Sequence, residues 1–68
     1  MYWEEIRKSE HFEEYHKGTL AWNDVITLIY KIKSKRKKGN KLEIEDDKFY
    51  ILCELKENIL YVINVKRK

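Results

Sequence analysis

Residues 41–65 read KLEIEDDKFYILCELKENILYVINV, and apolar side chains recur at every second position through most of this stretch. A period of two is typical of β-strands, because successive side chains point to opposite faces of a sheet. Asp46-Asp47 and Glu57-Asn58 interrupt the alternation and have the composition of turns. Residues 41–66 therefore predict a three-stranded antiparallel β-meander, and its last two strands carry apolar residues on both faces.

The preceding part of the chain favours helices. A helical stripe of apolar side chains spaced three and four residues apart is formed by Val25, Leu28, Ile29 and Ile32. A shorter helix is predicted to begin at Ser9 and to end before Gly18. The expected fold is an α+β single domain over residues 1–68, in which two N-terminal helices from residues 1–38 pack on one face of the meander.

The positive charges of the chain are segregated. Seven cations and no acid lie between Lys31 and Lys41, and three more close the chain at residues 66–68, although the net charge is only +3. A segregated basic surface holds a positive potential, which predicts a polyanionic partner, RNA first and DNA second. The alternatives are a solvated helix end for the first segment and a disordered tail for the second.

The predicted nucleic-acid-binding set combines these cations with two aromatic side chains. Its cations are Lys33, Lys35, Arg36, Lys37, Lys38, Lys66 and Arg67. Tyr50 and Tyr61 fall on adjacent predicted strands, where their rings would offer surfaces for stacked bases. Packing in the core or across strands is the competing role for both tyrosines.

Catalysis without a metal would depend on the two histidines. Cleavage of RNA needs a base, an acid and a cation that stabilises the phosphorane, and histidine is the side chain whose pKa lies closest to working pH. His11 and His16 are predicted to differ by about 140° on one helix, so they would not share a face. Either histidine would be the acid or base, and Arg67 or Arg36 would stabilise the phosphate. The alternative is that both are ordinary helix histidines without a catalytic role.

Other classes of site have little support. One cysteine and two poorly spaced histidines do not form a zinc pattern, and there is no glycine-rich phosphate loop, so no metal and no cofactor are expected. The single Cys53 excludes an internal disulfide and favours a reducing, cytoplasmic setting. Apolar runs of five residues are too short to span a membrane, and no signal peptide is visible. The abundance of Lys, Glu and Ile leans toward a thermophilic source.

Three short motifs carry a resemblance to a known group of proteins. They are the Ser9-x-His11 element, the Lys17-Gly18 step before a Trp-Asn-Asp-Val-Ile helix, and a final strand that ends Tyr-Val-Ile-Asn-Val-Lys-Arg at Arg67. With the order of elements, they resemble the small toxin-like ribonucleases allied to RelE and BrnT. The resemblance implies metal-independent RNA cleavage or simple RNA binding, and neutralisation by an antitoxin protein. The matching residue types are His11, Lys66 and Arg67.

The leading expectation is thus an RNA-directed, metal-independent ribonuclease-like toxin of a toxin–antitoxin system, an endoribonuclease if it is an enzyme at all. A second expectation is a non-catalytic nucleic-acid-binding module with the same footprint. A third is a protein-interaction domain, such as a homodimer that buries the second face of the sheet, in which the lysines only maintain solubility.

Overall fold

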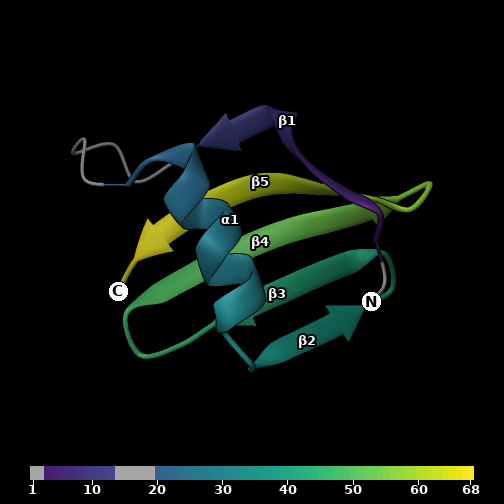
Figure 1. The fold of residues 1–68 in the computed structure, drawn as a ribbon. Helices are drawn as coiled ribbons and strands as arrows, with labels where there is room; N and C mark the ends of the chain where they lie inside the picture. The colour runs from purple at the N-terminus through teal and green to yellow at the C-terminus, as the bar shows by residue number, and fades with distance from the viewer. Residues whose placement is uncertain (1–2, 14–19) are drawn as a thin grey trace.

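The computed structural model describes residues 3–13 and 20–68, which form one five-stranded mixed β-sheet and one α-helix (Figure 1). The elements are β1 (Glu5–Glu13), α1 (Trp22–Lys31), β2 (Lys35–Lys38), β3 (Lys41–Glu45), β4 (Phe49–Lys56) and β5 (Ile59–Arg67). In the sheet the strands lie in the order β1-β5-β4-β3-β2. β1 runs parallel to β5, and all other neighbours are antiparallel.

The predicted fold class, two N-terminal helices on a three-stranded meander, is wrong. The first predicted helix begins at Ser9, but Ser9 lies within β1, and residues 14–19 of that helix lie outside the described residues. β1 is held by backbone pairing with β5, from Glu5 opposite Ile59 onwards. Because these partners come from opposite ends of the chain, the local spacing of side chains gives no sign of the strand.

The second predicted helix corresponds to α1, but it ends at Lys31. Residues 35–38, which the sequence places in the helical half, form the edge strand β2. Gly39 lies in the turn to β3 with a φ of 60°, a conformation that glycine adopts without steric cost. The predicted helical half, residues 1–38, therefore contains two strands.

β3, β4 and β5 form two successive antiparallel hairpins, as the alternation of their sequence predicts. Ile44 of β3 lies opposite Ile51 of β4, which lies opposite Val65 of β5. Glu57 and Asn58 close the second hairpin with φ values of 53° and 65°, which are typical of a two-residue turn between twisted strands.

A β-bulge changes which side chains of β5 point to each face of the sheet. Cys53 lies opposite Val62, whereas the preceding residue Leu52 lies opposite Asn64, so Ile63 is an extra residue in β5. The extra residue shifts the alternation by one position. As a result Val62 and Val65, three positions apart, both point into the core.

The core lies between α1 and one face of the sheet (Figure 1). Val25 and Ile29 of α1 are fully buried against a layer of strand residues that includes Ile44, Ile51 and Leu60. Burial of one such aliphatic side chain contributes about 1.5–3 kcal/mol, which makes this layer the main source of stability. The helical spacing of the apolar residues in α1 thus has the role that the sequence predicts for it.

Aromatic side chains close the two sides of this core. Trp3 is buried, and its indole N–H donates a hydrogen bond of 3.4 Å to the hydroxyl of Tyr30. On the β1 side, Phe12 meets Trp22 edge-on with ring centroids 5.6 Å apart. The ammonium group of Lys8 lies 5.3 Å from the centre of the Trp22 ring, a favourable cation–π distance.

The opposite face of the sheet, hereafter the open face, carries none of the described helix (Figure 1). Side chains that alternate with the buried ones point to it and are partly exposed: Glu43, Glu45, Tyr50, Leu52, Glu54, Tyr61 and Asn64. Arg36 of β2 pairs with Glu43, and Arg7 of β1 pairs with Tyr61, so both arginines join this face. Most of the side chains on this face are polar or aromatic, and whether a partner chain covers it, as the third expectation from the sequence has it, stays a prediction.

Candidate nucleic-acid interface

The register of the sheet brings two distant basic segments to one side of the molecule. Lys35 lies opposite Ile44, Ile44 opposite Ile51, and Ile51 opposite Val65, so the start of β2 is level with the end of β5. Lys48, in the turn between β3 and β4, lies at the same side. We call this region the basic end, and it comprises Lys31, Lys33, Lys35, Arg36, Lys48, Lys66, Arg67 and Lys68.

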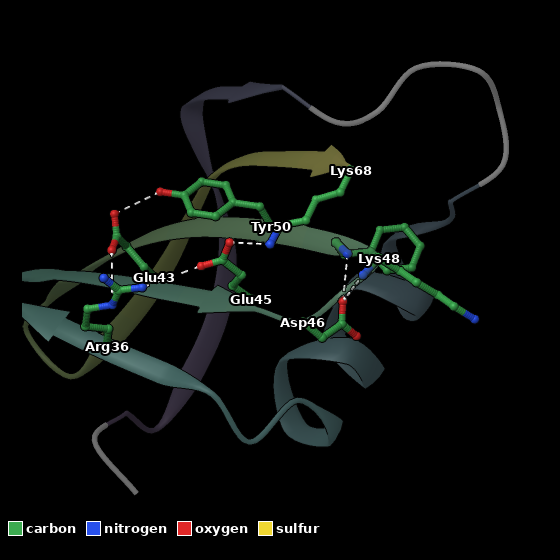
Figure 2. A network of polar contacts seen from close by, with 8 residues as sticks. Arg36, Glu43, Glu45, Asp46, Lys48, Tyr50 and Lys68 are labelled. Atoms are coloured by element: carbon green, nitrogen blue, oxygen red, sulfur yellow. Dashed lines mark hydrogen bonds and ion pairs between the residues drawn. The ribbon is translucent and has the colours of Figure 1, made fainter.

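On the open face, two carboxylates partly neutralise the basic end (Figure 2). The guanidinium of Arg36 lies 3.8 Å from Glu43 and 3.6 Å from Glu45, and Lys68 also forms an ion pair with Glu45. Tyr50 donates a hydrogen bond of 3.0 Å from its hydroxyl to Glu43. These pairs are partly solvated and screened by water, so they compete only weakly with another anion for Arg36 or Lys68.

The titration of these groups follows from their contacts. The hydrogen bond from Lys68 and its positive charge lower the pKa of Glu45. Burial, and then the hydrogen bond to Glu43, raise the pKa of Tyr50. At neutral pH Glu45 is therefore ionised and Tyr50 is neutral, which leaves the Tyr50 hydroxyl as a donor on the open face.

On the α1 side of the sheet, the basic end is less neutralised. Lys33, Lys48 and Arg67 are exposed, and none of them forms an ion pair within residues 3–13 and 20–68. Lys35 donates a hydrogen bond to the backbone carbonyl of Ile32, just after the end of α1, where a cation is favoured by the helix dipole. Exposed cations of this kind are available to phosphate groups.

An aspartate fixes the turn that carries Lys48 (Figure 2). Asp46 accepts hydrogen bonds from the backbone N–H groups of Lys48 at 2.8 Å and Phe49 at 2.7 Å. These two bonds are the main reason why the pKa of Asp46 is lowered. The carboxylate is thus occupied by the turn, while Phe49 stands directly opposite Arg67 across the β4–β5 pair.

The predicted binding residues are only partly brought together. The basic end contains Lys33, Lys35, Arg36, Lys66 and Arg67, with Tyr50 on the open face beside Lys66. Lys37 and Lys38 continue along edge strand β2 away from this end, toward the β2–β3 turn. Tyr61 lies opposite Glu54, toward the β4–β5 turn and away from the basic end.

The predicted catalytic residues are not assembled. His11 lies on β1 and borders a hollow of about 460 Å³ that is also lined by Glu54, Lys56 and Tyr61. Arg67 pairs with Phe49 at the opposite end of the β4–β5 hairpin. His16 lies outside the described residues. In the hollow beside His11, three glutamates outnumber two lysines, which disfavours a phosphate group there.

Three residues at the basic end and around it were not predicted from the sequence: Lys48, Phe49 and Lys68. Lys48 and Phe49 follow the Asp46-Asp47 pair, so their position indicates only a turn residue and a core residue. Lys68 is part of the basic C-terminus, but its contact with Glu45 depends on the pairing of β3 with β4 and β4 with β5. The run of cations at residues 66–68 was the sequence feature that pointed to Lys68 as part of a basic surface.

Other sites find no support in the described ranges. Among these residues, no group of three or more His, Cys, Asp or Glu side chains could hold a metal ion. Within the same ranges, no helix has the length and apolar character needed to cross a membrane. Cys53 is buried in the core, and its burial raises the pKa of the thiol to about 12.

The chain matches no protein-family model, no curated protein and no solved structure. The resemblance to the ribonucleases allied to RelE and BrnT therefore stays a prediction, as do an antitoxin partner and a homodimer.

Proposed function

We propose that this protein binds RNA through its basic end. The observation that carries the proposal is the register across four strands, which makes Lys35 level with Val65 and so brings the cations after α1 beside those at the end of β5. Clustered cations attract the phosphate backbone and release its counterions, which is the main source of affinity for nucleic acids that are not read base by base.

The state of the individual cations supports this proposal. Lys33, Lys48 and Arg67 are exposed and lack an ion-pair partner among the described residues, so phosphate contacts would not have to break existing pairs. On the open face, Arg36 and Lys68 share Glu43 and Glu45 in partly solvated pairs. Binding is therefore expected to rely more on the α1 side of the basic end than on the open face.

Single-stranded RNA fits this surface better than duplex DNA. Reading the major groove of DNA usually takes a protruding helix, but α1 is packed on the sheet and buries Val25 and Ile29 there. Phe49 and Tyr50 lie among the cations and are partly exposed. Single-stranded RNA offers unstacked bases to such rings.

RNA cleavage is a second candidate, and one observation favours it. His11 borders the same hollow as Glu54, which gives the two side-chain types that can act as acid and base in metal-free cleavage. The carboxylate excess in that hollow and its separation from Arg67 make it the weaker candidate. RNA binding at the basic end does not require cleavage at this hollow.

A fluorescence anisotropy titration of a labelled single-stranded RNA in EDTA, at about 0.15 M salt, tests the proposal. The variant K33Q/R67Q removes two charges from the basic end, and K41Q/K56Q removes two exposed charges remote from it. We expect K33Q/R67Q to weaken binding by about tenfold, equivalent to about 1.4 kcal/mol, and the control pair to have a much smaller effect.

Equal effects of the two variants, or no binding by the wild-type protein, would refute an interface at the basic end. Running the same samples on a denaturing gel tests cleavage in parallel. Loss of intact RNA with the wild-type protein, abolished by H11A and by E54Q, would establish the second candidate. Intact RNA with retained binding would leave a binding module.

A further inference from the structure

A hollow of about 500 Å³ lies on the α1 side of the basic end. It is bordered by the C-terminal part of α1 and by the turn between β3 and β4. Its apolar wall consists of Leu28, Ile32 and Phe49, and lysines 31, 33 and 48 stand around it. The volume lies within the range of about 300–1,000 Å³ that is usual for sites that bind small molecules.

The carboxylates around the hollow are mostly engaged elsewhere. Asp46 accepts the backbone N–H groups of Lys48 and Phe49, and Glu45 is paired with Arg36 and Lys68. Asp47 is the remaining acid of the rim. Lys31, Lys33 and Lys48 form no ion pair with another described side chain, although the charge of Lys48 acts on the nearby carboxylate of Asp46. Arg67 lies opposite Phe49.

We propose that this hollow takes one unstacked base of the bound RNA. The base would lie against the ring of Phe49, and the phosphates on either side of it would contact Lys33, Lys48 and Arg67. An apolar, aromatic wall with lysines and Arg67 at its edge matches a flat base attached to charged phosphates. This inference rests on the proposed function and adds to it a site that contacts the base and not only the backbone.

Two labelled probes separate base contacts from phosphate contacts. One is an RNA of about eight nucleotides, within the usual site size for single strands, and the other is an abasic ribose-phosphate oligomer of the same length. We expect the wild-type protein to bind the intact RNA about tenfold more tightly, the contribution of one base stacked on an aromatic ring. F49L keeps an apolar side chain at this position and should remove that difference while leaving the affinity for the abasic oligomer unchanged.

F12L is the matched control, because Phe12 is the other phenylalanine and lies on β1, at the far edge of the sheet. It should leave both affinities unchanged. Equal binding of the intact and abasic probes by the wild-type protein would overturn the base site while leaving the RNA-binding function in place. The base site would also be overturned if F49L weakened the binding of both probes equally. Binding of neither probe would overturn the proposed function itself.

Discussion

The hydroxyl of Tyr50 on β4 donates a hydrogen bond of 3.0 Å to the carboxylate of Glu43 on β3. Glu43 in turn lies 3.8 Å from the guanidinium of Arg36 on β2, so one short chain of polar contacts connects three strands across the open face (Figure 2). These contacts add to the backbone pairing with β3 that holds edge strand β2, which has no buried apolar side chain of its own.

Replacing Tyr50 by phenylalanine should lower the free energy of unfolding by about 1 kcal/mol at neutral pH, the usual net contribution of one hydrogen bond. Urea denaturation followed by circular dichroism measures this change. Y61F is the control, because no hydrogen bond links the Tyr61 hydroxyl to another described residue. An equal loss of stability in both variants would contradict a specific role for the Tyr50–Glu43 bond.

The effect of Y50F on stability should also depend on pH. Burial, followed by the hydrogen bond to Glu43, raises the pKa of Tyr50 above its ordinary value. The stability contributed by the neutral hydroxyl is then fully present below the unfolded pKa of about 10 and is lost as pH rises through the folded pKa. The difference in stability between wild type and Y50F should therefore narrow above about pH 10. A constant difference up to alkaline unfolding would argue against the raised pKa.

Asp46 should stabilise the turn between β3 and β4. D46A removes the acceptor for two backbone N–H groups, and we expect it to cost about 1–2 kcal/mol. The lowered pKa of Asp46 means that the contribution of its ionised form is present above the unfolded pKa of about 3.9 and is lost as pH falls through the folded pKa. The stability difference between wild type and D46N should thus shrink in acid.

The measurement is the midpoint of thermal unfolding between about pH 2 and pH 7, taken for wild type, D46A, D46N and the neighbouring control D47N. Asp47 is exposed and has no hydrogen bond to another described residue. If D47N is as destabilising as D46N at neutral pH, the turn does not depend on the Asp46 contacts.

Cys53 should be unreactive in the folded protein. Its side chain is fully buried, and burial raises the pKa of its thiol to about 12, so the reactive thiolate is scarce at neutral pH. A colorimetric thiol reagent should label the native protein only as fast as the chain unfolds, and labelling should be immediate in strong denaturant. Immediate labelling of the native protein would contradict the burial of Cys53 between α1 and the sheet.

Elements whose sequence carries its own periodicity could be predicted. The spacing of Val25 and Ile29 predicts α1, and the alternation around Ile44 and Ile51 predicts β3 and β4, because in both cases the buried side chains recur with the period of the element. The turn at Glu57 and Asn58 follows from the same alternation. Local patterns of this kind are enough for the hairpins of β3, β4 and β5.

β1 and β2 lack such local signals. Residues 9–13 contain one apolar side chain, Phe12, and so show no alternation. The parallel pairing of β1 with β5, at Glu5 to Lys8 and again at Glu13, defines the strand. β2 reads KRKK and has no apolar alternation at all, so its strand conformation depends on backbone pairing with β3. Long-range backbone hydrogen bonds determine that β1 and β2 are strands, and the spacing of their side chains does not indicate such bonds.

The candidate site, like the fold, could be predicted only in part. The clustering of cations in residues 31–38 and 66–68 could be identified from the sequence alone. Their convergence depends on the register that makes Lys35 level with Val65, and the separation of His11 from Arg67 depends on the pairing of β1 and β4 with β5. Sequence patterns identify which side chains are available, whereas the sheet determines which of them act together.

RNA binding at the basic end is tested most directly by its salt dependence in wild type, K33Q/R67Q and the control K41Q/K56Q. For single strands, the slope of log K against log salt changes by about 0.7 for each phosphate contact. We predict that K33Q/R67Q reduces the magnitude of the slope by about 1.4, and that the control leaves it nearly unchanged. Identical slopes for the wild type and K33Q/R67Q would contradict phosphate binding at the basic end.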